Sequence, residues 1–228
     1  MHAQMQMASL LIADMYGLTP DYAQARKWAE KPAAQGCGLS AHNLGLILLR
    51  GSHGIEANRH MGLTWLMKSA YSGSESGQLT LGEVLRGGLY GVGVNGAKAM
   101  QWFRKAAAQG NLDALSKMGF MLRSGGADVA CDPIEAEQCF RKSATMGNAL
   151  SMYLLAIMYK NGIGHVVRDA RQYVRWCARA AVSMPLAAAK LKQDANNGIA
   201  DAQWAYACHL RDSGCGIDEY QPYVRAAV

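Results

Sequence analysis

The stretch at residues 97–111 reads AKAMQWFRKAAAQGN, and the architecture of the chain follows from it. Its apolar side chains recur three and four positions apart, so they share one face of an α-helix. The residues of this face are Ala99, Trp102, Phe103, Ala106 and Ala107. The helix is predicted to end at Gly110 and Asn111, because glycine readily adopts the left-handed backbone conformation that closes a helix.

The same pattern recurs along the chain with a period of 37 residues, as from position 65 to position 102. One column of the repeat consists of Trp28, Trp65, Trp102, Cys139 and Trp176. A basic column in the same phase consists of Lys31, Lys68, Lys105, Lys142 and Arg179, and a glycine column of Gly36, Gly73, Gly110 and Gly147. Because chance does not keep several columns in phase, the chain is built from internal repeats.

A second helix precedes the tryptophan helix in each repeat. In the third repeat Leu81, Gly82 and Leu85 share one helical face, and Gly87 and Gly88 stop that helix. The small-residue column of this helix consists of Gly45, Gly82, Gly119 and Ala156. We name the small-residue helix helix A and the tryptophan helix helix B.

Small residues in helix A allow a neighbouring helix to approach closely, and the tryptophan column fills the space between stacked pairs. Neither helix can bury its apolar face alone. The repeats are therefore predicted to stack into an all-α fold, an α/α superhelical solenoid of helix-turn-helix repeats.

These residues resemble a known family. The pair at 81–82, the glycines at 87–88, the loop GVGV at 91–94 and the stretch at 97–111 are similar to the Sel1-like repeat, a relative of the tetratricopeptide repeat. The likeness recurs at 41–73, 112–148 and 149–181. It implies an α/α solenoid that acts as an adaptor or scaffold for other proteins, often in bacteria.

A single solenoid domain is expected over residues 1–228. The expected repeats are 1–36, 37–73, 74–110, 111–147, 148–184 and 185–228. The first is interpreted as an N-terminal cap, because Ala8 replaces the usual glycine and its shortened loop contains Pro20. After Trp176 the repeat no longer keeps its period. The expected segments there are an inserted helix near 185–197, a further helix A at 201–207 and a truncated helix B at 223–227.

Composition excludes several classes of protein. With 50% hydrophobic and 18% charged residues the chain can bury a core, so disorder is not expected. No apolar stretch approaches the roughly 18 to 20 residues of a membrane-spanning helix. The net charge of +6 is spread along the chain, so nucleic-acid binding is not expected.

No signal peptide is visible, but one could have been removed, so bacterial periplasm and cytoplasm both stay open. A monomer is expected.

The six cysteines contain no C-x-x-C motif, so zinc-ribbon and thioredoxin-like sites are not indicated. Cys131 with Cys139, and Cys208 with Cys215, are close enough in sequence to form disulfides in an oxidising compartment. Free thiols in a reducing cytosol explain the same residues equally well.

No catalytic, cofactor or metal site is predicted. The segment 91–96 matches G-x-G-x-x-G, but no strand precedes it and it belongs to the loop of the repeat, so a dinucleotide site is not indicated. The histidines are scattered over different repeats without metal-ligand spacing. They are His2, His42, His53, His60, His165 and His209. We therefore expect that the chain is not an enzyme.

The resemblance places helix A on the concave face of the solenoid. Four residues after the small-residue column come Leu49, Arg86, Arg123 and Lys160, and Arg211 follows Ala207 of the further helix A by the same step, so four of the five residues are basic. Neighbouring positions hold Phe120, Tyr153, Trp204, Glu83 and His42. A cationic ladder beside an aromatic strip predicts a groove for an acidic peptide or loop. A second interpretation stays open, because the helix dipole favours basic residues near a helix C-terminus without any partner.

The expected function is that of a non-catalytic protein-interaction module or adaptor that binds a partner protein in its concave groove. The alternative is an immunity or inhibitor protein that neutralises a bacterial toxin or effector by direct binding. A hydrolase of cell-wall material is the least favoured possibility.

Overall fold

The computed structural model describes residues 22–51, 57–126, 128–164, 166–214 and 217–227. These residues form helices, turns and loops, and none of them belongs to a β-strand apart from one isolated bridge between Gly126 and Val129. The predicted all-α class is confirmed for this part of the chain. None of its helices combines the length and the apolar character needed to cross a membrane. Ala8 and Pro20, on which the interpretation of the first repeat rests, lie outside the described residues.

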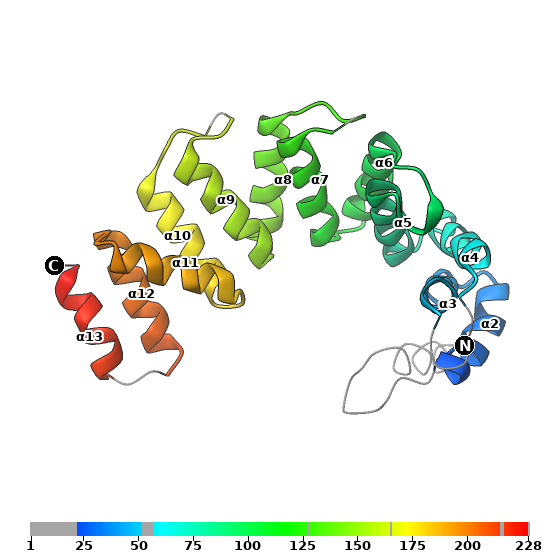
Figure 1. Ribbon diagram of the computed structural model, residues 1–228, viewed down its shortest axis with the longest axis horizontal. Helices are drawn as coiled ribbons and strands as arrows, with labels where there is room; N and C mark the ends of the chain where they lie inside the picture. The colour runs from blue at the N-terminus through cyan, green and yellow to red at the C-terminus, as the bar shows by residue number, and fades with distance from the viewer. Residues whose placement is uncertain (1–21, 52–56, 127, 165, 215–216, 228) are drawn as a thin grey trace. The chain divides into compact units, whose positions relative to one another are not determined.

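Twelve α-helices follow one another along the described residues (Figure 1). In chain order they are α2 (Tyr22–Ala34), α3 (Gly38–Arg50), α4 (Arg59–Tyr71), α5 (Glu75–Gly87), α6 (Gly96–Ala108), α7 (Leu112–Ser124), α8 (Pro133–Thr145), α9 (Ala149–Asn161), α10 (Ala170–Ala181), α11 (Pro185–Asn196), α12 (Ala200–Asp212) and α13 (Ile217–Ala226). A short 3-10 helix, η1 (Leu89–Gly91), lies between α5 and α6. The A helices are α3, α5, α7 and α9, and the B helices are α2, α4, α6, α8 and α10.

The chain divides into two compact units, Met1–Ala114 and Leu115–Val228. In the first unit, each helix from α2 to α6 contacts the next helix along the chain. In the second unit, the same holds from α8 to α13. Within each unit, neighbours in sequence are thus neighbours in space, as stacked helical repeats require. The single-domain expectation stays a prediction.

A tight glycine turn joins helix B of one repeat to helix A of the next. Positive φ angles between 87° and 101° occur at the glycines of these turns, Gly36, Gly73, Gly110 and Gly147. The residue after the glycine donates its N–H to a carbonyl five residues earlier, as from Asn111 to Ala106 at 3.2 Å. This bond closes the C-terminus of the helix. The helix end predicted at Gly110 is therefore confirmed.

A longer loop joins helix A to helix B and ends in a residue that caps helix B. The cap accepts the backbone N–H three residues further on, as Asn95 does from Lys98 at 2.8 Å. The equivalent caps are Asn58, Asp132 and Asp169. Each cap satisfies an N–H group that the first turn of a helix leaves without a partner. The glycine-rich segment 91–96 lies in such a loop and in the first residue of α6, with no strand before it among the described residues.

Helices A and B of one repeat pack through a small residue that faces a large one. Gly82 on α5 faces Phe103 on α6, and a Cβ atom at Gly82 would lie 2.6 Å from the ring. Gly119 on α7 faces Phe140 on α8 in the same way, at 2.8 Å. Both phenylalanines are fully buried. The glycine thus makes room for the ring that fills the interior of the repeat.

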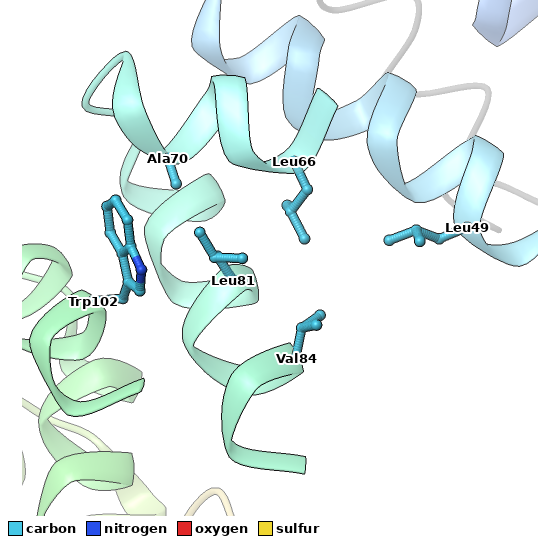
Figure 2. Packing of buried hydrophobic residues seen from close by; sticks show 6 residues of the cluster. All are labelled: Leu49, Leu66, Ala70, Leu81, Val84 and Trp102. Carbon is cyan, nitrogen blue, oxygen red and sulfur yellow. The ribbon is translucent and has the colours of Figure 1, made fainter. Parts of the chain in front are cut away.

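One core cluster of the first unit is assembled from successive helices (Figure 2). Its residues are Leu49 of α3, Leu66 and Ala70 of α4, Leu81 and Val84 of α5, and Trp102 of α6. Trp102 is 9% exposed and meets the Tyr71 ring edge-on, with 5.1 Å between ring centroids. In the same column Trp176 is buried, Trp65 is half-buried and Trp28 is exposed. Because several helices share one core, stacking of the repeats supplies its stability.

The packing departs from the repeat after α10. The helix predicted near 185–197 is present as α11, and it contacts both α10 and α12. Three residues separate α10 from α11, and three separate α11 from α12, so no long loop intervenes. Helix α12 also contacts α10. Helix α13 begins at Ile217, earlier than the helix predicted at 223–227.

Candidate partner-binding surface

The residues predicted to face a partner lie on A helices or on α12. In the first unit they are His42 on α3 and Glu83 and Arg86 on α5. In the second unit they are Phe120 and Arg123 on α7, Tyr153 and Lys160 on α9, and Trp204 and Arg211 on α12. Some of these side chains are exposed, and others bind neighbouring helices of the same unit.

Phe120 and Arg123 form a pair on the surface of α7. Phe120 is 45% exposed, and the Arg123 Cζ atom lies 5.4 Å from the centre of its ring. Gly119 faces α8 and Met118 is buried, so the helix turns Phe120 away from the core. Aromatic and arginine side chains dominate the energetics of protein interfaces. This pair therefore has the chemistry of an interface anchor.

Helix α12 presents a second exposed aromatic residue, Trp204, which is 55% exposed. Arg211 pairs with Asp212, with 2.9 Å between Nη2 and Oδ1, and both side chains lie largely in solvent. Such a surface pair contributes little to stability. A pocket of 350 Å³ between α10 and α12 is lined in part by Val182, Ala205 and Cys208. Its volume is at the lower end of the range of small-molecule sites.

Lys160 belongs to a polar cluster around Asp194 of α11. Asp194 is 2% exposed, and its carboxylate accepts hydrogen bonds from the Lys160 ammonium at 3.2 and 3.3 Å. The Lys190 ammonium lies 3.7 Å from the same carboxylate, and the Tyr173 hydroxyl donates to it. The Lys160 ammonium also lies 4.7 Å from the centre of the Tyr173 ring. The cluster ties α9 and α10 to α11.

Burial sets the protonation states in this cluster. Burial, reinforced by the hydrogen bond to Asp194, raises the pKa of the Tyr173 hydroxyl, so this group remains a proton donor. Burial also raises the pKa of the Cys177 thiol to about 11, so the thiol is neutral and a poor nucleophile. The pKa of Tyr153 is raised by burial and then by Cys177 and Asp194. Tyr153 therefore lies in the surroundings of the cluster.

His42 joins two A helices of the first unit. Its Nε2 atom lies 2.9 Å from the Thr80 hydroxyl oxygen, so α3 and α5 share a hydrogen bond. The Nδ1 atom is buried without a hydrogen-bond partner among the described residues. Burial lowers the pKa of His42 below its ordinary value of 6.5. The neutral imidazole is therefore the form that this interface accommodates.

The stability of the first unit is expected to fall as the pH is lowered through 6.5. Since folding depresses the pKa of His42, the unfolded chain binds the proton more readily, and stability that is present above the ordinary pKa is lost below it. Urea unfolding at about pH 7.5 and about pH 5.5 measures this loss. His42→Gln should reduce the difference, whereas His60→Gln, at an exposed position on α4, should not. The same pH dependence in both variants would contradict the assignment.

The repeats identify the family. The Sel1 repeat model matches residues 2–37, 38–74, 76–111, 112–148 and 149–181. The chain belongs to the Sel1 repeat family. Sel1 repeat proteins are generally protein-interaction modules and are typically non-catalytic. No curated protein matches this chain.

Solved Sel1 repeat structures share the fold. A Sel1 repeat protein from Oxalobacter formigenes is 30% identical, with 84% of this chain and 54% of that chain covered and a TM-score of 0.71. A protective antigen of uropathogenic Escherichia coli is 26% identical, with 99% of this chain and 53% of that chain covered and a TM-score of 0.70. This Sel1 chain thus spans little more than half the length of either protein.

An immunity protein from Pseudomonas aeruginosa is more distant. It is 17% identical to this Sel1 chain, with 99% of this chain and 80% of that chain covered and a TM-score of 0.55. At this level of identity the likeness shows the fold alone.

No disulfide joins the described cysteines of this Sel1 chain. Cys131 is exposed and Cys139 is buried, and the two are not joined. The other pairing considered for the sequence, Cys208 with Cys215, involves a residue outside the described ranges. Within those ranges, no three His, Cys, Asp or Glu side chains come together as metal ligands would.

The cluster around Asp194 was not predicted from the sequence, because α11 was interpreted as an insertion. A signal was present in the sequence. Leu191 follows Leu155 by 36 residues, close to the Sel1 period, and both leucines are fully buried. In this register Asp194 is equivalent to Met158, whose side chain is also buried. Alignment of α11 with the A helices would therefore have placed the carboxylate against the preceding repeat.

Proposed function

We propose that this Sel1 repeat chain is a non-catalytic module that binds an acidic, extended segment of a partner protein. The pair of the exposed Phe120 and the half-buried Arg123 on α7 is the observation that carries the proposal. Membership of a family whose proteins bind other proteins supports it. We place the binding surface on the exposed side of the A helices.

The two side chains offer complementary interactions to one segment. Phe120 exposes an aromatic ring, and its removal from water on binding is favourable. The Arg123 guanidinium lies over this ring, and a guanidinium stacked in this way still has N–H groups that can donate two parallel hydrogen bonds to a carboxylate. A partner segment with an apolar residue next to an acidic one would use both.

Other predicted residues take different parts in this proposal. We assign Trp204 and Arg211 to the same surface within the second unit, because both are exposed. Glu83 and Arg86 offer a separate contact on α5 of the first unit. We assign internal packing roles to the three residues that bind or face neighbouring helices, which are His42, Tyr153 and Lys160.

Combined replacement of Phe120 by alanine and of Arg123 by glutamate is expected to abolish partner capture. Truncation of an interface anchor costs at least about 2 kcal/mol, which corresponds to a loss of roughly thirtyfold in affinity. The measurement is affinity capture from the source cell with the tagged chain. The affinity of the captured protein for each purified variant is then determined.

The matched control carries Ile134→Ala and Lys142→Glu on α8. These residues are again an apolar residue and a base, both of them exposed, but they lie on a B helix. The control should keep native affinity and native helical content. Undiminished capture by the variant of Phe120 and Arg123 would refute the proposed surface.

The immunity or inhibitor role predicted as the alternative would use the same kind of surface. A solved immunity protein has the same fold, and that likeness carries no argument about this chain's partner. The identity of the captured protein separates the two roles, since a toxin would indicate the inhibitor and a protein without toxic activity would indicate the adaptor.

A further inference from the structure

Helix α10 carries a stripe of arginines that the proposed function does not use. Arg171, Arg175 and Arg179 are four residues apart, so they follow one face of the helix, and all three are exposed. The opposite face of α10 is packed into the second unit through Tyr173, Val174, Trp176, Cys177, Ala180 and Ala181. The stripe is therefore the outward face of a firmly anchored helix.

The stripe is unfavourable for the isolated chain. Like charges four residues apart repel each other and destabilise a helix. Among the described residues, no carboxylate forms an ion pair with Arg171 or Arg175. Arg179 has a contact of another kind, since its Cζ atom lies 5.1 Å from the centre of the Trp176 ring. Within the described parts of the chain, no ion pair with a carboxylate offsets the repulsion between Arg171 and Arg175.

The other repeats act as internal controls for this stripe. The position of Arg179 is basic in each of them, but none has lysine or arginine at all three positions, although the first repeat carries Lys27 at the position of Arg175. The residues equivalent to Arg171 are Ala23, His60, Ala97 and Ile134, and those equivalent to Arg175 are Lys27, Thr64, Gln101 and Gln138. The Sel1 fold thus forms without arginine at these two positions, and the stripe is a property of this repeat alone.

We propose that the outward face of α10 binds an acidic α-helix of a partner protein, whose carboxylates are spaced one turn apart. Four residues of an α-helix rise by about 6 Å, so two helices laid side by side bring such charges into register. Each guanidinium can bind a carboxylate through two parallel hydrogen bonds. This surface lies on a B helix, so the proposal does not depend on the role of Phe120 and Arg123.

Three arginines suit a protein partner better than a membrane or a nucleic acid. Lipid-binding patches gather about four to eight basic residues. Nucleic-acid binding of appreciable strength takes roughly six to ten phosphate contacts. The aromatic ring nearest the stripe, Trp176, is 6% exposed and cannot stack with a base. A protein interface, by contrast, can rest on a few arginine anchors.

The test uses the full chain and two synthetic helical peptides of identical composition. In the first peptide three glutamates lie four residues apart, and in the second they are distributed around the helix. Fluorescence anisotropy should show that the first peptide binds at least tenfold more tightly. The double variant Arg171→Glu and Arg175→Glu should lose this binding at least tenfold, and Arg171→Lys with Arg175→Lys should lose part of it because lysine cannot form the paired bonds.

A control with the same change in charge, Arg59→Glu and Lys98→Glu, alters exposed residues in the first turns of α4 and α6 and should bind as the native chain does. The thermal midpoint of the double arginine variant should not fall, because the change relieves repulsion within α10.

Equal binding of the two peptides overturns the proposal. So does arginine-dependent binding of phosphatidylserine vesicles or of a single-stranded oligonucleotide that is tighter than that of the first peptide. The variant with Phe120→Ala and Arg123→Glu should still bind the first peptide. This result separates the present proposal from the proposed function.

Discussion

Replacement of Asp194 by alanine is expected to lower the free energy of unfolding of the second unit by about 3 kcal/mol. The carboxylate is almost completely buried and binds the Lys160 ammonium and the Tyr173 hydroxyl. Without it the hydroxyl loses its acceptor, and the ammonium loses its counter-charge. The Lys160 side chain is 34% exposed, so water recovers part of the loss and the effect stays at the lower end for a broken buried pair.

Urea unfolding followed by circular dichroism measures this change. Asp201→Ala is the control, because it removes an exposed carboxylate from the first turn of α12 and should cost less than about 1 kcal/mol. Addition of Lys160→Met to Asp194→Ala should restore part of the stability, since the Lys160 ammonium is then not left without its partner. Equal losses from Asp194→Ala and Asp201→Ala would show that the cluster does not hold α11 in place.

The second large effect is expected where helix A meets helix B. Gly119→Ala should cost about 2 kcal/mol, because the added Cβ atom meets the Phe140 ring and the surrounding core must shift. Phe140→Cys should cost about 3 kcal/mol, because it leaves a cavity at a fully buried position. The fifth repeat has Ala156 and Cys177 at the equivalent positions, and both are fully buried.

The double variant Gly119→Ala with Phe140→Cys should therefore lose less than the sum of the single losses, by at least about 1 kcal/mol. Gly126→Ala serves as the control, because no atom lies close to the position of its Cβ atom and little change is expected. Urea unfolding of the four chains gives the coupling energy. Strictly additive losses would mean that the two positions do not compensate each other in size.

The repeat architecture could be predicted because its causes are local. The 37-residue period, the apolar face around Trp102 and the glycine at position 110 each act through nearby residues. The helix at Pro185–Asn196 could likewise be predicted from its own sequence. Periodic patterns of this kind are the strongest structural signal that a single sequence contains.

The candidate surface could be predicted less fully, because exposure depends on contacts between helices. Lys160 and Arg123 occupy the same position in successive repeats, but Lys160 meets Asp194 of α11 whereas Arg123 stacks on Phe120. His42 was predicted to face a partner, and the structure places it beside Thr80 of α5. The period assigns each of these residues to a helix position, but it does not tell which neighbouring helix carries a complementary group.

The matched sizes of Gly119 with Phe140, and of Ala156 with Cys177, bear on how such a chain can change by recombination. A crossover within the loop between helices A and B would set alanine against phenylalanine, or glycine against cysteine, and so create a clash or a void. A crossover at a glycine turn such as Gly147 exchanges both members of a pair together. The segment from one glycine turn to the next is therefore the piece of this chain that can be duplicated, lost or transplanted with its interior intact.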